Sequence, residues 1–443
     1  MTNRRIAFNI LNRVICEGAY ANLALKDELA GMHGNAASAI TALVYNTIER
    51  INYADFLLHH YVTGRLHGSI RLVLRMGISE LLFMKSPVYA VCDESVKLTK
   101  DIGKAKLSGF VNAVLRRIDR ERDSLPDLPE DATERFNILY GVPRFMAKEY
   151  ISLYGEGFTE SLLKSNVHSV TIRAQYPFTS MELEAYLNAK GISYHRGRLT
   201  GEAFILESGI DVINNELFAA GKIAVQSESA MLASLACGAG EGDRVLDVCG
   251  APGGKTAYLA SIMHDNGSIT TWDIHSHRVD LTKSTLDRLH VSIARASQHD
   301  ASELEKSFID SMDVVLVDAP CSGLGGGSKP DAYLNRTERS IFELSELQNR
   351  ILGCCCKYVK AGGVLVYSTC TISKRENEDN ILRFLNTHEE FGLDSLEFCL
   401  PDGYVGRSYS GMIQLFPNMD GVDGFFIARM KRRAQDGGHT NEA

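Results

Sequence analysis

The sequence lacks the features that would assign it to several specialised classes of protein. No apolar run approaches the length of a membrane span, the opening residues MTNRRIAFNILNRV contain no apolar signal core, and there is no internal repeat or low-complexity tract. These absences predict a soluble, cytoplasmic protein that does not contact a membrane. The 443 residues, 45% of them apolar, are enough to bury a large core and predict two or three domains.

The ten cysteines have none of the spacings of a disulfide framework or a zinc site. Cys16 and Cys92 stand alone, and there is no CxxC pair or cluster of His and Cys. We therefore expect reduced thiols and no metal. Cys354, Cys355 and Cys356 are consecutive in a stretch of helical character and are expected to pack within that helix.

The net charge of −8 is unevenly distributed. Residues 1–125 hold 17 Lys and Arg against 12 Asp and Glu, whereas the rest of the chain is acidic. An N-terminal excess of positive charge is compatible with contacts to nucleic-acid phosphates. It is equally compatible with an ordinary solvated helical surface, and charge alone does not separate the two.

Periodicity predicts a multidomain protein. Apolar residues recur at helical spacing in IAFNILNRVI, ITALVYNTIERINYADFLLHHYV and IRLVLRMGISELLFM, which predicts an all-α helical bundle over residues 1–125. The polar segment RDSLPDLPEDATE (122–134) predicts a linker. Mixed signals over 126–235 predict a small α+β connector, residues 236–433 an α/β domain, and residues 434–443 a disordered tail.

The α/β domain is predicted from strands that alternate with helices. The strands are RVLDV (244–248), SITTWDI (268–274), VVLVDA (314–319) and VLVYST (364–369), with a helix over 340–359 and a further strand in DGFFIARM near the C-terminus. This alternation predicts a doubly wound, Rossmann-like sheet, and ligands of such sheets bind beyond the carboxyl ends of the strands.

Two cysteines follow predicted strands of this sheet. Cys321 lies in DVVLVDAPCSG and Cys370 in GGVLVYSTCTI, so both thiols should face one pocket. A glycine-rich turn after a third strand should bring a nucleoside-type cofactor to the same edge. Two thiols beside a nucleoside pocket predict covalent chemistry on a base. The alternative for either thiol is a small, buried apolar side chain.

The glycine-rich turn, CGAPGGKT (249–256), differs from a phosphate-binding P-loop. Gly250 and Gly254 enclose three residues where a P-loop has four, and Cys249 occupies the position of the first glycine. A P-loop NTPase, with Asp318 as its magnesium ligand, remains an alternative. In the favoured interpretation, Asp273 at the end of the second strand accepts hydrogen bonds from ribose hydroxyls. Asp273 and Asp300 could instead be ordinary turn residues.

DVCGAPGGKT, DAPCSG and YSTCT, in this order, resemble the motifs of RNA cytosine-5 methyltransferases that use S-adenosylmethionine. RRIAFNILNRV, LVYNTIERINYADFLL, RMGISELLFM and SGFVNAVLRRI resemble the NusB-like N-terminal domain of the bacterial RsmB/Sun family, the 16S rRNA (cytosine(967)-C(5))-methyltransferases. The resemblance implies methylation of a cytosine in RNA, with 16S rRNA as substrate. Transfer RNA and 23S rRNA are alternative substrates, and a non-catalytic RNA-binding protein is an alternative function.

The chemistry explains why this family needs a cysteine. Carbon 5 of cytosine is too weak a nucleophile to take a methyl group until a thiolate has added at carbon 6. The resemblance implies that Cys370 is this nucleophile and that Cys321 assists product release. From the residues alone the two roles could be exchanged. The target base must leave its stack to reach such a pocket.

The resemblance also assigns the remaining site residues. It implies that Asp318 contacts the base and lies near the cofactor, and that Lys255 steadies the electron-rich ring or the thiolate. The residues implied to bind S-adenosylmethionine are Cys249, Gly250, Ala251, Pro252, Gly253, Gly254, Lys255, Asp273, Asp300 and Asp318. RNA is the implied partner, and the protein is expected to act as a monomer.

The chain departs from the family pattern in three places. Gly250 replaces an alanine of the glycine-rich turn, and FNILYGVPRF in the connector lacks the usual His-Pro-Trp character. After the second motif the chain reads GLGGGSKPDAY (323–333) and keeps only Lys329 of the usual basic residues. We therefore expect a looser, less charged RNA-facing loop.

Overall fold

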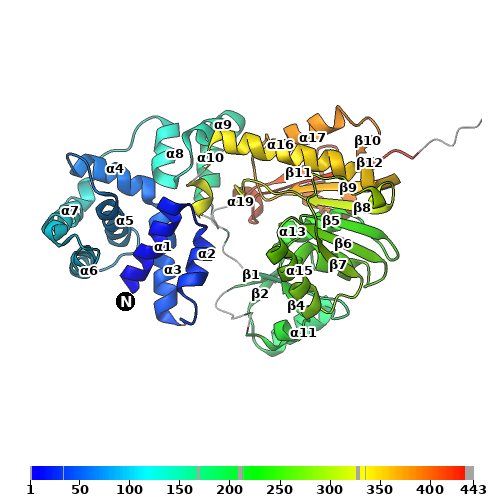
Figure 1. Ribbon diagram of the computed structural model, residues 1–443, viewed down its shortest axis with the longest axis horizontal. Helices are drawn as coiled ribbons and strands as arrows, with labels where there is room; N and C mark the ends of the chain where they lie inside the picture. Colours follow the sequence, from blue (N-terminus) through cyan, green and yellow to red (C-terminus); the bar gives the residue numbers. More distant parts are fainter. Residues whose placement is uncertain are drawn as a thin grey trace, which may run out of the picture. The chain divides into compact units, whose positions relative to one another are not determined.

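The structure is a computed structural model that describes residues 2–32, 34–165, 167, 170–207, 212, 214–325, 330–334 and 336–434. Contacts divide the chain into two compact units (Figure 1). Unit 1 comprises residues 1–164 and 329–337, and unit 2 comprises residues 165–328 and 338–443. Within the described residues, no helix is both long and apolar enough to cross a membrane.

Unit 1 is helical, as the periodicity predicts. Its helices are α1 (Asn3–Glu17), α2 (Ala21–Glu28), α3 (Asn35–Glu49), α4 (Ile51–Tyr61), α5 (Gly68–Leu82), α6 (Val88–Asp101), α7 (Ser108–Arg120), α8 (Ala132–Tyr140), α9 (Arg144–Tyr154) and α10 (Glu156–Lys164). Short 3₁₀ turns are η1 (Ala105–Leu107), η2 (Arg122–Ser124) and η4 (Pro330–Tyr333). The boundary predicted at residue 125 therefore falls inside unit 1, because α8, α9 and α10 belong with the preceding helices.

Helix α1 shows how local sequence produces the bundle. The hydroxyl of Thr2 accepts a hydrogen bond from the backbone N–H of Arg5, and Gly18 ends the helix with φ +73°. Between these caps, Ile10 and Val14 are buried one helical turn apart. Close helix packing also needs small residues, since a Cβ at Gly77 of α5 would lie 2.8 Å from the side chain of Leu115 on α7.

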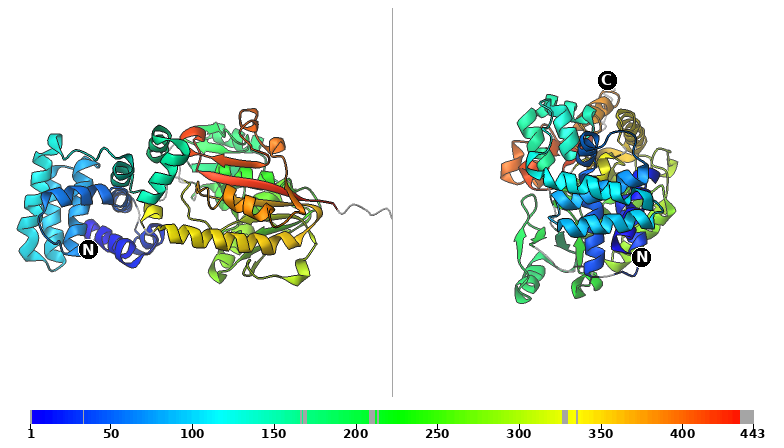
Figure 2. Two further views of the ribbon diagram at one scale, coloured as in Figure 1. Left: turned by 90° about the horizontal axis from the view of Figure 1, so that it is seen from above. Right: turned by 90° about the vertical axis from the view of Figure 1, so that its left-hand side faces the viewer.

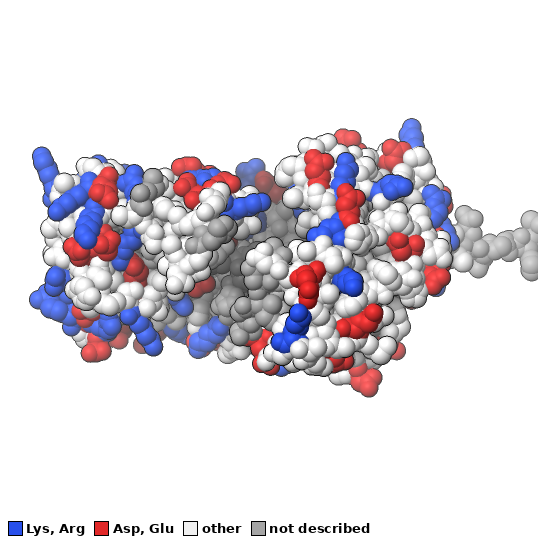
Figure 3. Space-filling model, turned by 90° about the horizontal axis from the view of Figure 1, so that it is seen from below, with Lys and Arg blue, Asp and Glu red and all other residues white. Residues whose placement is uncertain are grey.

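The surface of unit 1 mixes charges of both signs. Figure 3 shows Lys and Arg side chains interspersed with Asp and Glu on the visible face, not one continuous basic patch. This face by itself does not distinguish an RNA-binding surface from an ordinary solvated one.

A short segment from the second half of the chain belongs to unit 1. Asp331, in η4, accepts a hydrogen bond from the backbone N–H of Ala21 over 2.9 Å, and Leu334 packs against the core of the bundle. These two contacts hold the C-terminal end of the loop that we expect to face RNA. Residues 326–329, which include Lys329, lie outside the described residues.

Unit 2 begins with the predicted α+β connector. Its elements are β1 (Val170–Ala174), α11 (Ser180–Ala189), β2 (Tyr194–Arg196), β3 (Phe204–Leu206), α12 (Glu216–Ala219) and β4 (Ile223–Val225). The strands form an antiparallel sheet in the order β2-β3-β1-β4. Helix α11 starts with a reciprocal capping box between Thr179 and Glu182.

The larger sheet of unit 2 has, within the described residues, eight strands. They are β5 (Arg244–Val248), β6 (Ser268–Asp273), β7 (Ala294–Gln298), β8 (Met312–Asp318), β9 (Val359–Thr369), β10 (Phe391–Leu393), β11 (Met412–Leu415) and β12 (Phe425–Arg432). The order is β10-β12-β9-β8-β5-β6-β7, with β11 also paired to β12. Strands β5 to β9 are parallel, and β12 is antiparallel to β9.

Helices cover both faces of this sheet (Figures 1 and 2). They are α13 (Glu228–Ala236), α14 (Gly254–Ile262), α15 (Ser276–Arg288), α16 (Glu338–Cys355), α17 (Glu378–Leu385), α18 (Asp402–Val405) and α19 (Pro417–Asp420), with 3₁₀ turns η3 (Lys306–Phe308), η5 (Cys356–Tyr358) and η6 (Glu397–Cys399). Successive residues of β8 alternate between two apolar clusters: Leu316 packs towards α14 and α15, and Val317 packs towards α16 and α17.

The predicted strands at 244–248, 268–274, 314–319 and 364–369 are all present, as is the C-terminal strand. The sequence analysis did not identify β7, β10 and β11. The sequence of β7, ARASQ, has no apolar run because this strand lies at an edge and is largely exposed. The predicted tail at 434–443 lies outside the described residues from residue 435 onwards.

Candidate active site

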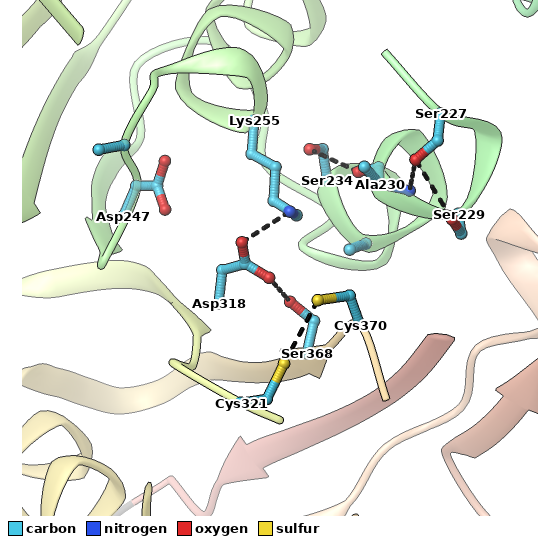
Figure 4. Close-up of polar contacts among 12 residues, drawn as sticks. Ser227, Ser229, Ala230, Ser234, Asp247, Lys255, Asp318, Cys321, Ser368 and Cys370 are labelled. Atoms are coloured by element: carbon cyan, nitrogen blue, oxygen red, sulfur yellow. Dashed lines mark hydrogen bonds and ion pairs between the residues drawn. The ribbon is translucent and has the colours of Figure 1, made fainter. Parts of the chain in front are cut away.

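The two predicted thiols meet at the carboxyl ends of adjacent strands. Cys321 follows β8 by three residues and Cys370 directly follows β9, and these strands are parallel neighbours. The two Sγ atoms lie 3.3 Å apart and point toward each other (Figure 4). Both side chains are half-buried. At this distance the pair can share a proton, so the two thiols form one chemical unit.

An ion pair lies beside the thiols. Lys255, in the first turn of α14, donates from Nζ to Oδ2 of Asp318 over 2.7 Å, and Asp318 is the last residue of β8 (Figure 4). The other carboxylate oxygen of Asp318 accepts a hydrogen bond from the hydroxyl of Ser368 over 2.8 Å. The sequence-predicted residues Lys255, Asp318, Cys321 and Cys370 therefore lie together.

Burial and charge set the protonation of this group. The contact with Cys370 raises the pKa of the Cys321 thiol well above its ordinary value, and burial adds to the effect. Burial would lower the pKa of Lys255, but the attraction of Asp318 outweighs it and raises that pKa. The site therefore holds a fixed positive charge beside a pair of coupled thiols.

The glycine-rich turn connects β5 to α14. Gly253, with φ +95°, precedes the first residue of the helix, and nothing lies within 4 Å of where a Cβ of Gly254 would stand. Gly250, which replaces an alanine of the family pattern, is closely packed. A Cβ there would lie 2.3 Å from Oγ1 of Thr271 and 2.6 Å from the carboxylate of Asp247. The replacement therefore fits its local surroundings.

Asp247, the last residue but one of β5, was not singled out from the sequence. Its side chain is fully buried, and Oδ2 accepts a hydrogen bond from the hydroxyl of Thr256 over 2.6 Å. Burial raises its pKa to about 7, and the nearby charge of Asp318 adds to this. Its position in DVCGAPGGKT was a signal, but nothing in the sequence showed that it is buried.

Asp273 stands at the end of β6, as predicted for a ribose-binding carboxylate. It is 3% exposed, accepts a hydrogen bond from the N–H of His275, and pairs with Arg278 at 2.9 Å. Arg278 also donates to the carbonyl oxygen of Ala251 over 2.9 Å and so ties the turn to β6. A carboxylate has further acceptor sites, and Asp273 could therefore also accept from a ligand hydroxyl.

Asp300 has at least one local structural role. Its Oδ1 accepts hydrogen bonds from the backbone N–H and the hydroxyl of Ser302, and the pKa of Asp300 is lowered by these contacts. These hydrogen bonds match the alternative interpretation of Asp300 as an ordinary turn residue. A cofactor contact of Asp300 remains a prediction.

The cysteine trio lies apart from the thiol pair. Cys355 ends α16, Cys356 begins η5, and both are buried in the apolar cluster behind the sheet. Cys354 donates to the carbonyl oxygen of Ser302.

The sequence did not predict a group of buried polar side chains next to the two thiols, which comprises Ser322, Thr371 and Glu376. Ser322 and Thr371 directly follow the two cysteines, and their hydroxyl oxygens lie 2.9 Å apart. The carboxylate of Glu376 accepts hydrogen bonds from the backbone N–H and the hydroxyl of Ser322. A hydroxyl residue after each cysteine was a visible signal. Glu376 was hidden, because the run SKRENED resembles a solvated, charged segment.

Comparisons with known proteins agree with this arrangement. Residues 235–431 match the model of the family described as 16S rRNA methyltransferase RsmB/F, and residues 1–120 match the NusB family. The chain is 33% identical to a probable ribosomal RNA small subunit methyltransferase B of Bacillus subtilis, over 97% of this chain and 98% of that protein.

Solved structures share the fold. The crystal structure of PH0851 superimposes with a TM-score of 0.80 at 24% identity, and the match covers 98% of this chain and 99% of that one. A structure of NSun6 from Pyrococcus horikoshii with SFG has a TM-score of 0.59 at 20% identity and covers 66% of this chain and 98% of that one.

These matches extend over both units and include the three motifs around the thiol pair. They favour a methyltransferase over a P-loop NTPase and over a non-catalytic RNA-binding protein. The chain belongs to the RsmB/F family of 16S rRNA methyltransferases, with an N-terminal domain of the NusB family.

Proposed function

We propose that this protein methylates carbon 5 of a cytosine in 16S rRNA, in the cytoplasm, with S-adenosylmethionine as methyl donor. The observation that carries the proposal is the pair of thiols, 3.3 Å apart, beside the Lys255–Asp318 ion pair. Covalent activation of cytosine requires a thiolate, and a second thiol in contact with it offers a route for proton transfer.

The residues around the glycine-rich turn fit a nucleoside-type donor. The N-terminus of α14 opens beside the turn, Asp273 closes the end of β6, and Gly254 leaves space at the helix start. We assign donor binding to Cys249–Gly254, Asp273 and Asp300. When bound, S-adenosylmethionine supplies an electrophilic methyl group to carbon 5.

Cys370 acts first in the proposed mechanism. Its Sγ forms a bond to carbon 6, and the electron pair of the 5,6 double bond shifts toward carbon 5. Lys255 contributes positive charge close to Cys370, which favours the thiolate. The carboxylate of Asp318 lies where it can accept a hydrogen bond from the amino group of cytosine, which uracil lacks.

Cys321 acts after methyl transfer. The carbon-5 proton must leave, the double bond re-forms, and the bond between carbon 6 and Cys370 breaks. While Cys370 is bound to carbon it carries no charge, so the main cause of the raised pKa of Cys321 is removed. The Cys321 thiol can then lose its proton to water, and the resulting thiolate accepts the carbon-5 proton as the double bond re-forms and the bond from carbon 6 to Cys370 breaks.

Two substitutions test the cysteine roles. Cys370→Ala should abolish both methylated product and covalent adduct. Cys321→Ala should still form the adduct but release it slowly, leaving a denaturant-resistant protein–RNA species on a gel. Cys354→Ala, in the helix behind the sheet, is the control and should behave as wild type. A stable adduct from Cys370→Ala but none from Cys321→Ala would exchange the two assignments.

We further propose that unit 1 binds the RNA through its positive excess. Lys106, Arg116 and Arg120 are exposed near or on α7. Replacing all three by Gln should weaken RNA binding by about tenfold and lower the slope of log affinity against log salt, since each lost phosphate contact removes about one unit of slope. Fluorescence anisotropy measures this. Lys283→Gln in unit 2 is the control, and an unchanged salt slope in the triple variant would contradict the proposal.

A further inference from the structure

Glu376 is a fully buried carboxylate next to the thiol pair. It lies between β9 and α17 and is 0% exposed. Its Oε1 accepts hydrogen bonds from the backbone N–H of Ser322 over 2.9 Å and from Nε2 of Gln348 over 3.0 Å. Its Oε2 accepts from the hydroxyl of Ser322 over 2.5 Å. In all three contacts Glu376 is the acceptor, which is the role of an ionised carboxylate.

These contacts join the two cysteine segments. Because Ser322 donates its hydroxyl proton to Glu376, it accepts from Thr371, whose oxygen lies 2.9 Å away. Gln348, on α16, also donates to the carbonyl oxygen of Pro320 over 3.0 Å, directly before Cys321. The carboxylate is thus fixed to the residues on either side of Cys321 and, through one hydroxyl, to the residue after Cys370.

The charged groups around the thiols are arranged asymmetrically. The contact with Cys370 is the main cause of the raised pKa of Cys321, burial adds to it, and the charge of Glu376, in the loop before α17, raises that pKa further. Tyr367 of β9 is neutral because burial raises its pKa. Lys255 of α14, paired with Asp318 of β8, interacts with Cys370. Glu376 is thus fixed to the residue after Cys321, whereas the positive charge of Lys255 interacts with Cys370.

We propose that Glu376 is a positioning residue that keeps the shared proton of the thiol pair on Cys321, so that Cys370 is the thiolate before RNA binds. The proposal rests on the roles proposed above for the two cysteines. It explains why the chain buries a carboxylate beside the thiol that must be uncharged when Cys370 attacks, since an ionised Cys321 at that stage would place two negative charges in one buried region.

The alkylation rates of Cys321 and Cys370 report which of the two thiols carries the proton, and the measurement needs neither RNA nor cofactor. Initial rates of iodoacetamide labelling of Cys321 and Cys370, resolved by mass spectrometry of peptides at pH 7.5, report the thiolate fraction of each. In the wild type Cys370 should react faster. In Glu376→Gln, which keeps the shape but removes the charge, the ratio of the Cys370 rate to the Cys321 rate should fall at least fivefold. Glu378→Gln, two residues along and paired only at the surface with Lys374, is the control and should keep the wild-type ratio.

A loosened fold would give a different result. Cys355 is fully buried, so its labelling in the same samples reports unfolding. If Cys355 is labelled in Glu376→Gln, the Ser322→Ala variant tests the proposal instead, because it keeps the carboxylate of Glu376 and removes only the hydroxyl of Ser322. The proposal expects Ser322→Ala to keep the wild-type ratio within twofold. An unchanged ratio in Glu376→Gln, or a collapsed ratio in Ser322→Ala, overturns it.

Failure of the proposed cysteine roles would appear elsewhere. Adduct formation by Cys370→Ala would exchange the roles while leaving the alkylation ratios as expected. The two experiments therefore fail independently.

Discussion

Unit 1 and unit 2 bury polar groups in different ways. In unit 1 the buried carboxylate of Glu80 is paired with Arg4 at 2.5 Å, and the other buried polar side chains of its described residues are single hydroxyls spread over α3, α5, α6 and α10. In unit 2, buried polar side chains gather where β8 and β9 end. They are Ser322, Gln348, Ser368, Thr369, Thr371, Glu376, Asn377 and Asn380. Burying so many polar groups costs free energy that packing alone does not require. Buried polarity therefore marks the reaction site of unit 2.

The largest effect should come from breaking the ion pair of the site. Asp318→Asn leaves Lys255 without its partner, and breaking a buried pair costs about 3–5 kcal/mol. The substitution also alters the proposed acceptor for the cytosine amino group, and loss of one preorganised contact of this kind typically lowers the rate by about a hundredfold to a thousandfold, which is the fall expected in methyl transfer to RNA. Single-turnover transfer of labelled methyl groups measures this.

The control for Asp318→Asn is on the same strand. Asp313→Asn changes an acid near the opposite end of β8, where Asp313 pairs with Lys360 and accepts from the N–H of Arg244. It should keep most of the activity. Equal losses in the two variants would show that β8 is simply sensitive to substitution and that buried polarity does not mark the site.

The pH dependence of stability should separate the two units. Burial raises the pKa of Glu80 and of Asp247 to about 7. Because each folded-state pKa exceeds the unfolded value, the native state binds the proton more tightly, and stability falls as pH rises from about 4 to 7. Asp247→Asn should remove this loss in unit 2 and Glu80→Gln should remove it in unit 1. Relative to wild type, each variant should gain about 2 kcal/mol between pH 5 and pH 8.

Two probes can assign this gain. Trp272 is the single tryptophan of the chain and is buried in unit 2, so its fluorescence reports the unfolding of that unit. The circular dichroism of helices reports unit 1 more strongly. Asp247→Asn should shift the fluorescence transition in urea, whereas Glu80→Gln should shift only the helical signal. A fluorescence shift from Glu80→Gln would mean that the units do not unfold separately.

Sequence reasoning succeeded where a local pattern dictates structure. The runs that became β5, β6, β8 and β9 are apolar because these strands are buried on both faces, and the cysteines after two of them necessarily meet at one edge. It failed where the partner is remote in sequence. Glu376 looks solvated until Ser322, 54 residues earlier, is brought against it. The compact unit that contains the N-terminal helices extends to residue 164, beyond the domain boundary predicted at 125, because α8 packs on α4 while α9 and α10 pack on α8.

The smallest predicted effect concerns the segment around Asp331. This segment lies in the second half of the sequence, but its contacts assign it to unit 1. Helix α2 has no side-chain cap from its own N-cap residue, Tyr20, and the carboxylate of Asp331 accepts the N–H of Ala21 instead. A carboxylate at a helix N-terminus contributes about 1 kcal/mol. Asp331→Ala should therefore destabilise unit 1 by about this amount, which lowers the helical transition but leaves Trp272 fluorescence unchanged.

The same substitution should also affect catalysis slightly, because Asp331 anchors the far end of the loop that begins at Cys321. With that anchor weakened, the rate of methyl transfer should fall about twofold to fivefold, less than 1 kcal/mol. Asp123→Ala, which removes an exposed acid of η2 in unit 1, is the matched control and should change neither quantity. If Asp331→Ala moves the fluorescence transition and not the helical one, the segment is held by unit 2, and the boundary between the units must be redrawn.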